Sequence, residues 1–355
     1  MKTNIYLLVF GIIAAIIIIA ALSTLVFNKA PQTKTVSLAD LPYNAPAPPI
    51  QGISGWINSP PLNLSQLRGK VVIIDFWTYS CINCIRTIPY LNAWYSRYGN
   101  DGLVIIGVSS PEFPFEHNYT NVENAVQRFG IKYPVALDNN FSTWTAYDNH
   151  YWPADYIIDK NGNVRYVTFG EGDYNQTEQV IRELLQDAGY TLPANYTNPP
   201  EPVNFSQIET PEIYLGYSRA REPIGNSQGF SPGLVVNYTP QQITQNNTVY
   251  FTGNWYNDPD GMIAAGNNSK LFLVYRAKNV NIVASGNYSN ITVRLDGSNL
   301  SQQYLGQDVH LVGGRAVATI NSSRLYNVVA APGYAWHEIE IDASPGFKIY
   351  TFTFG

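Results

Sequence analysis

Two cysteines three positions apart carry the clearest chemistry in this chain. Cys81 and Cys84 are the only cysteines among 355 residues. They follow a run of β-branched residues that starts at Val71, and they precede apolar residues at helical spacing that end before Gly99. Cys81 would then lie at a helix N-terminus, where free amides and the helix dipole stabilise a thiolate. Cys84, one turn further into the helix, is close enough to Cys81 to form a Cys81–Cys84 disulfide. The pattern predicts dithiol–disulfide exchange.

A structural disulfide and half of a zinc site are the alternatives. Zinc would need two more ligands, and the histidines are scattered without paired spacing, at His117, His150, His310 and His337. A structural bridge that closes so short a loop would stabilise the fold little. We therefore expect a redox-active cysteine pair, no metal and no further cofactor.

Asp75 lies six positions before Cys81, with an apolar run on one side and Phe76-Trp77 on the other. A buried carboxylate is costly unless it is paired, or protonated with a raised pKa. The alternative is a solvated residue at the end of the strand. The apolar neighbours on both sides favour a buried acid.

Residues 51–190 alternate between strand and helix patterns, which predicts a mixed sheet with helices on both faces. Asn161-Gly162 predicts a hairpin turn, and Trp152-Pro153 precedes a main strand. We expect strands at 55–57, 71–76, 103–108, 133–137, 155–159 and 164–167, and helices after Cys81, at 122–129 and at 176–188.

The N-terminal stretch from Ile5 to Phe27 is apolar and uncharged. A bilayer-spanning helix needs about 20 such residues, whereas a cleavable signal peptide has a shorter core of about 7–15. We therefore expect an uncleaved, single transmembrane anchor in residues 1–28. Residues 29–50 are rich in Pro, Ala and Thr and predict an extended linker.

Pro and Asn are frequent again in a second predicted linker, residues 191–211, and residues 212–355 then read as an all-β sandwich. The expected strands are 248–253, 270–275, 280–284, 291–295, 316–320, 326–330, 338–341 and 348–354. Four aromatic residues in this part could stack on a sugar ring: Trp255, Tyr256, Tyr334 and Trp336. The alternative, which we favour, is that they fill the core or the rim of the sandwich.

The composition points to the outside of a membrane. Charged residues make up 13%, the sequence pI is about 5.4 and no basic stripe suits nucleic acid. Asn-x-Ser/Thr sequons recur from Asn63 to Asn321, most of them in the second half. This favours an extracytoplasmic glycoprotein on the cell membrane.

Residues 51–190 resemble the thioredoxin-fold domain of extracytoplasmic TlpA/ResA-like thiol–disulfide oxidoreductases, and more closely the periplasmic part of DipZ-type proteins. The matching stretches are residues 75–84, 133–140, 151–154 and 169–175. The C-terminal part resembles the carbohydrate-binding jelly roll of DipZ-type proteins. The resemblance thus implies an α/β thioredoxin-like domain followed by a β-sandwich.

The same resemblance implies roles for single residues. Asp75 would face Cys84 and assist its deprotonation, and Pro89 would kink the helix. Pro153 would be cis and face the cysteine pair, so that its backbone pairs with an extended substrate. Trp77 and Trp152 would line the approach.

A disulfide reductase acting on extracytoplasmic proteins is the function we expect. DipZ-type proteins carry a CcdA-like membrane domain that this chain replaces by one apolar span, so a CcdA-like electron donor would act in trans. An oxidant or isomerase, and a glycan-binding protein with a non-catalytic thioredoxin domain, are the alternatives. A peroxiredoxin would require a Pro-x-x-x-Thr/Ser-x-x-Cys motif, which does not surround Cys81. A copper chaperone would require Cys-x-x-x-Cys and a distal histidine, and the two-residue spacing here argues against it.

Overall fold

A computed structural model describes residues 37–192, 199 and 207–355. Leu41–Gly355 forms one compact unit, and within it we call residues 41–190 the α/β part and residues 212–355 the β-rich part. The predicted membrane anchor lies outside the described residues, as does most of the second predicted linker. Within the described ranges, no helix combines the length and apolarity that crossing a bilayer requires.

The α/β part contains one mixed sheet with strand order β1-β7-β6-β3-β4-β5-β2. Its strands are β1 (Ala45–Pro46), β2 (Gly55–Ile57), β3 (Val71–Trp77), β4 (Leu103–Ser109), β5 (Val135–Leu137), β6 (Ala154–Ile158) and β7 (Asn163–Phe169). Its helices are α2 (Ile82–Tyr98), α3 (Tyr119–Arg128), α4 (Ser142–Ala146) and α5 (Tyr174–Asp187), and short 3₁₀ turns cover Leu38–Asp40, Leu64–Leu67, Gly99–Asp101 and Pro114–His117.

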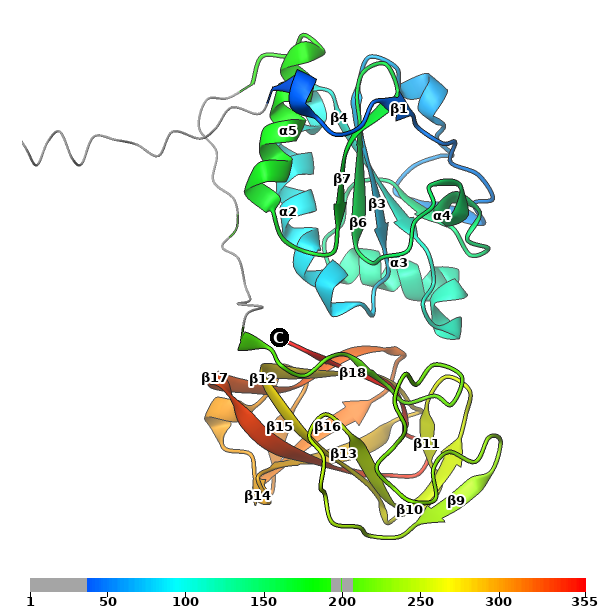
Figure 1. Cartoon of the computed structure of the whole chain (residues 1–355), viewed down its shortest axis with the longest axis vertical. Coiled ribbons are helices and arrows are strands. Elements are labelled where there is room, and N and C mark those ends of the chain that lie inside the picture. The colour runs from blue at the N-terminus through cyan, green and yellow to red at the C-terminus, as the bar shows by residue number, and fades with distance from the viewer. Residues whose placement is uncertain (1–36, 193–198, 200–206) are drawn as a thin grey trace, which may run out of the picture. The chain divides into compact units, whose positions relative to one another are not determined.

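The central strand β3 is buried over its whole length. It pairs in parallel with β4 and antiparallel with β6, and β4 pairs in parallel with β5. Because parallel crossovers are right-handed, α2 and α3 lie on the same face of the sheet. Figure 1 shows α5 beside α2 on that face, where Trp94 Nε1 of α2 donates to Glu178 of α5 at 3.2 Å.

The opposite face is covered by α4 and the chain before β3. Phe76 packs edge-on against Trp144 and Tyr147, with ring centroids 5.6 and 5.5 Å apart. Val72 and Ile74 of β3 belong to the same buried cluster. Alternate residues of β3 therefore face different layers, which places Asp75 on the side of α2.

Most of the predicted α/β elements are confirmed, including helices on both faces and the hairpin at Asn161-Gly162, where Gly162 has φ +77°. Within the predicted linker 29–50, Ala45–Pro46 pair with β7 as the edge strand β1. The short helix α4 was not predicted, since it has too few residues to show a period.

The β-rich part forms one sheet with the path β15-β16-β13-β17-β12-β10-β11-β18-β8, with β9 on β10 and β14 on β13. Its strands are β8 (Ile213–Tyr214), β9 (Val235–Tyr238), β10 (Val249–Asn257), β11 (Met262–Ala264), β12 (Ser269–Ser285), β13 (Ser289–Leu295), β14 (Ser298–Asn299), β15 (His310–Val312), β16 (Arg315–Ile320), β17 (Arg324–Ala343) and β18 (Lys348–Phe354), with a 3₁₀ turn at Gln302–Tyr304.

Two long strands organise this sheet. Four predicted short strands merge pairwise into β12 and β17, which pair over most of their length with register shifts near Ala277 and Val280. The second half of β12 also pairs with β18, so the sheet bends around a single apolar core. Trp255 lies at the centre of this core with no exposed surface.

Candidate active site

Cys81 is the N-cap residue of α2, as the sequence predicts. Its Sγ accepts a hydrogen bond from the backbone N–H of Cys84 at 3.3 Å, and its side chain is partly exposed. A sulfur at this position receives both an amide donor and the positive end of the helix dipole, and both stabilise a thiolate.

Cys84 lies one turn into α2 and is buried, with 1% exposure. Burial, and then the neighbouring Cys81, raise the pKa of the Cys84 thiol well above its usual value. Both cysteines are free thiols in this structure, so the Cys81–Cys84 disulfide stays a prediction. The two sulfurs differ as an exchange reaction needs. One is accessible and accepts an amide hydrogen bond at a helix N-terminus, and the other is buried and needs help to lose its proton.

Asp75 is buried below this pair, with 1% exposure. It lies directly opposite Asp155 in the β3–β6 ladder, and Asp155 is itself only 5% exposed. Among the described residues, neither oxygen of Asp75 has a hydrogen-bond partner, nor does Oδ1 of Asp155. Two carboxyl groups on adjacent strands are therefore enclosed beside Cys84, and each has the other as its side-chain neighbour.

Both carboxyl groups hold protons more tightly than ordinary acids. Burial raises the pKa of Asp75 well above its usual value, and the charge of Asp155 adds to that rise. Burial also raises the pKa of Asp155 to about 7. Two carboxyl groups this close do not both ionise readily, so one proton is shared between them near neutral pH.

Two more unpartnered polar groups lie next to the carboxyl pair. Trp77 Nε1 and the Tyr133 hydroxyl are buried and have no hydrogen-bond partner among the described residues. Gly107, opposite Asp75 on β4, leaves room for both: an added Cβ would lie 2.9 Å from Trp77 Nε1 and 3.2 Å from the Tyr133 ring. A glycine is thus required where these side chains converge.

The segment before Cys81 is fixed by a buried glutamate. Ser80 Oγ donates to Glu116 at 2.5 Å, and the backbone N–H groups of Glu112 and Phe113 donate to the same carboxylate at 2.5 and 3.0 Å. Because Ser80 directly precedes Cys81, this network sets the entry into α2.

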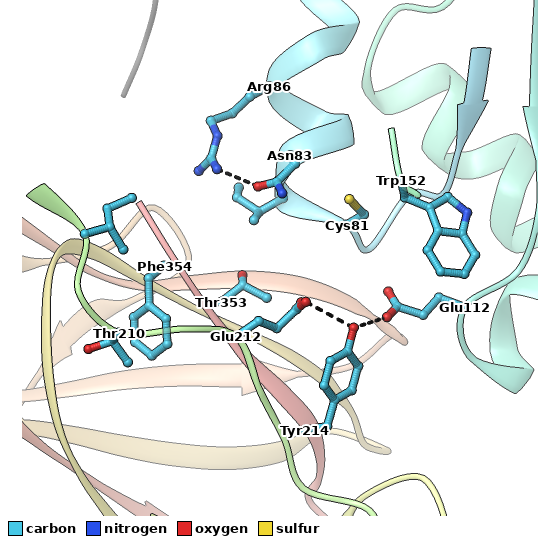
Figure 2. Close-up of a pocket in the computed structure, with 12 residues that line it drawn as sticks. Cys81, Asn83, Arg86, Glu112, Trp152, Thr210, Glu212, Tyr214, Thr353 and Phe354 are labelled. Carbon is cyan, nitrogen blue, oxygen red and sulfur yellow. Dashed lines mark hydrogen bonds between the residues drawn. The ribbon is translucent and has the colours of Figure 1, made fainter. Parts of the chain in front are cut away.

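The predicted proline loop is present. The Trp152–Pro153 peptide bond is cis, which confirms the prediction drawn from the resemblance. Trp152 is anchored by a hydrogen bond from its Nε1 to Ser110 O at 3.1 Å, and it lines the same cavity as Cys81. Figure 2 shows both side chains at that cavity.

Comparison with known proteins places this geometry in a family. Residues 46–167 match the AhpC/TSA family, and residues 210–355 match a family described as "Thioredoxin like C-terminal domain". Protein DipZ from Mycobacterium bovis and from Mycobacterium tuberculosis is 39% identical over 314 residues, which are 87% of this chain and 43% of each relative. The chain thus spans less than half the length of these relatives.

The thiol-disulfide oxidoreductase ResA of Bacillus thuringiensis is 31% identical over 123 residues, which cover 35% of this chain and 68% of ResA. The chain belongs to the thioredoxin-like thiol–disulfide oxidoreductases. The crystal structure of a thiol-disulfide isomerase from Corynebacterium glutamicum aligns with a TM-score of 0.36 at 25% identity, over 39% of this chain and 96% of that one.

One tryptophan of this oxidoreductase does not lie where the sequence suggested. Trp77 was predicted to line the approach to the cysteines, but it has no exposed surface, because it shares the inner face of β3 with Asp75. Trp255 follows the alternative that the sequence favoured, packing in the core, and not glycan stacking. Its ring packs on Phe251, and its Nε1 donates to Thr252 O at 3.0 Å. Trp336 is 41% exposed.

Sequence reasoning missed Asp155 and Glu116. Asp155 interrupts an apolar strand immediately after the proline loop, and the same argument that marked Asp75 applies to it. Glu116 gave no such signal, since it lies in a loop whose path a pattern does not fix. Among the described residues, no group of three His, Cys, Asp or Glu side chains could hold a metal ion.

Proposed function

We propose that this oxidoreductase is a membrane-anchored, extracytoplasmic disulfide reductase that acts on proteins. The observation that carries the proposal is the pairing of an accessible Cys81 at a helix N-terminus with a buried Cys84 beside the enclosed Asp75–Asp155 carboxyl pair. The apolar stretch Ile5–Phe27 and the recurring Asn-x-Ser/Thr sequons support the anchored, extracytoplasmic setting.

In the first step, the Cys81 thiolate attacks a substrate disulfide, forms a mixed disulfide and releases one substrate sulfur as a thiolate. In the second step, the Asp75–Asp155 pair takes the proton of Cys84, and the new thiolate attacks Cys81. The second substrate sulfur then leaves, and the protein holds a Cys81–Cys84 disulfide. The substrate gains two electrons, and protons restore its two thiols.

Substrate binding falls to the proline loop in this proposal. The backbone at Pro153 pairs with an extended substrate segment, and Trp152 lies against it. Trp77 acts only as packing beneath the site. We propose residues 1–28 as the anchor, 51–190 as the catalytic domain and 212–355 as a jelly-roll domain, with linkers between them.

Replacing the resolving cysteine tests the proposal. Cys84→Ser leaves Cys81 able to attack but unable to be released, so mixed disulfides with extracytoplasmic proteins should accumulate in membranes of the source cell. Non-reducing electrophoresis would detect them, and Cys81→Ser/Cys84→Ser is the matched control. If Cys84→Ser traps no partner above this control, protein disulfides are not its substrates.

The direction of electron flow needs a separate measurement. We propose reduction, with a CcdA-like membrane protein as donor in trans. A reduction potential near or below about −250 mV, the thioredoxin range, fits a reductant. A value of about −120 to −180 mV would instead assign the role of an oxidant or isomerase.

A second candidate function concerns the β-rich part. Trp336 presents an exposed indole on β17, a surface that suits stacking on a sugar ring. Trp336→Ala should then abolish retention on a glycan array without changing the unfolding curve. Equal retention of the variant and the wild type would remove Trp336 from any glycan site.

A further inference from the structure

The β-rich part supplies one wall of the cavity into which Cys81 opens. This cavity measures about 340 Å³ and is lined by Cys81 and Trp152 on one side and by Glu212, Tyr214 and Thr353 on the other. Figure 2 shows these side chains converging from the two parts of the chain. Any disulfide that reaches Cys81 therefore also contacts residues outside the α/β part.

Contacts outside the cavity hold this wall in place. Phe113 packs on Tyr350 with ring centroids 5.1 Å apart, and Val283 and Leu325 belong to the same buried cluster. The Arg219 guanidinium lies over the Phe113 ring, 4.7 Å from its centroid. The wall is thus supported by an apolar contact and not by polar groups alone.

Two carboxylates share one hydroxyl at the edge of the cavity. The Tyr214 hydroxyl is hydrogen-bonded to Glu112, and also to Glu212 at 3.1 Å, although a phenol has one proton to donate. The Arg219 guanidinium reaches Glu112 at 3.4 Å. Burial, and then the charge of Glu212, raise the pKa of Glu112 to about 8.

Burial raises the pKa of Glu212, and the nearby charges of Arg221 and Arg219 oppose that rise. Neither of these arginines lines the cavity, and the cation that does, Arg86, pairs with Glu171. The lining therefore holds two carboxyl groups and one cation that already has a partner.

The wall that carries Glu212 and Tyr214 also offers a hydrogen-bonding group without a partner. Thr353 is 2% exposed and its Oγ1 has no partner among the described residues. Figure 2 shows this hydroxyl pointing toward the start of α2, across the space in front of Cys81. A buried hydroxyl without a partner is costly, so its position is explained by a ligand that supplies one.

We propose that this cavity is a substrate subsite that selects disulfides in which the attacked cysteine is next to a lysine or an arginine. The inference rests on the proposed exchange at Cys81. The substrate's cation lies between Glu112 and Glu212 and replaces the proton that they otherwise bind. Thr353 Oγ1 bonds to the substrate backbone. A cavity of this size is at the lower end for ligand sites, so it admits an extended segment and not a folded surface.

A pair of peptides tests the subsite. Each carries one intramolecular disulfide, with either arginine or glutamine beside the attacked cysteine. The rate of Cys81 oxidation in the reduced protein should be about tenfold higher for the arginine peptide, the ratio expected for one charge-assisted contact. In Glu212→Gln this ratio should fall close to one.

Two further variants refine the test. Glu209→Gln is the matched control, because Glu209 precedes the same segment, pairs with Arg276 and does not line the cavity; it should keep the wild-type ratio. Thr353→Val should slow both peptides alike, since the hydroxyl contacts backbone. Unchanged rates for both peptides in Thr353→Val would contradict that contact.

The outcomes separate this inference from the proposed function. Equal wild-type rates for the two peptides would overturn the cation subsite and leave disulfide exchange intact. An unchanged preference in Glu212→Gln would also overturn it. If the reduced protein oxidised with neither peptide nor any other disulfide, the exchange reaction itself would be wrong.

Discussion

Buried acids occur in two regions on the same face of the central sheet, and the two regions differ in the hydrogen-bond donors that surround the carboxyl groups. Glu178 on α5 has a side chain with no exposed surface, and it accepts hydrogen bonds from Trp94 Nε1 at 3.2 Å and from the Tyr98 hydroxyl at 2.6 Å. It also pairs with Arg97. Asp75 and Asp155 are comparably enclosed, yet apart from Asp155 no hydrogen-bond donor reaches Asp75 within the described chain.

This difference distinguishes a buried acid that stabilises the fold from one that is able to exchange a proton. Donors compensate the Glu178 carboxylate, so it ties α5 to α2 and has no capacity left for a reaction. The Asp75–Asp155 pair has no such compensation and retains a proton instead. Burial alone marks neither role. In the proposed exchange reaction, the chemical role belongs to the acid pair that retains a proton and lies beside a thiol.

The largest expected effect is on catalysis. Asp75→Asn should lower turnover with a small disulfide about 100-fold at pH 7, because an amide cannot take the proton of Cys84. The free energy of unfolding should not fall, since the variant removes a buried acid. Glu178→Gln is the control and should keep its turnover. A slow Glu178→Gln enzyme would remove the distinction between the two regions.

Stability should respond in the opposite way. Glu178→Gln should lower the free energy of unfolding by about 1–3 kcal/mol, because Arg97 loses its charged partner and the buried donors bond to a weaker acceptor. Denaturant titration of this variant beside Asp75→Asn measures both values. If the two variants unfold at the same denaturant concentration, Glu178 is not the structural acid described above.

The sequence predicted much of the site because its signals are local. Cys81, Cys84 and Asp75 lie on consecutive elements, where an apolar strand followed by a helical pattern fixes their order in space. Asp155 comes from β6, and only the β3–β6 register brings it opposite Asp75. Trp77 was misplaced because alternation along β3, rather than nearness to Cys81 in sequence, decides where its ring points.

The β-rich part was harder to predict than the α/β part. Its strand positions were largely correct, but the short predicted strands merge into β12 and β17 because the strands bend where a pattern shows a break. Its contribution of Glu212, Tyr214 and Thr353 to the cavity at Cys81 depends on contacts between segments over a hundred residues apart, such as Tyr214 with Glu112. No local pattern reports such contacts.

The last expected effect is a pH dependence of stability. Asp155 has a folded-state pKa of about 7 and an unfolded value of about 3.9. Between these values the folded protein binds more protons than the unfolded chain, so this contribution to stability is complete below pH 4 and is lost as pH rises toward 7.

Asp155→Asn should therefore remove the part of the fall in unfolding free energy between pH 4 and pH 7 that comes from Asp155. Its unfolding free energy should increase relative to the wild type by at most about 1.4 kcal/mol per pH unit across this range. Denaturant titrations at intervals from pH 4 to pH 8 would show this trend, and Asp187→Asn, an exposed change on α5, is the control. If the difference in unfolding free energy between Asp155→Asn and the wild type stays constant with pH, Asp155 does not bind the extra proton.

The most direct test of the account is a single-turnover reaction that resolves the two steps. Reduced wild-type protein and Asp75→Asn are each mixed with a disulfide whose released thiol absorbs light, and quenched samples report the mixed disulfide at Cys81. The account predicts equal rates of mixed-disulfide formation and about 100-fold slower resolution by Cys84 in Asp75→Asn. Equal resolution rates in the two proteins would contradict the claim that the Asp75–Asp155 pair takes the proton of Cys84.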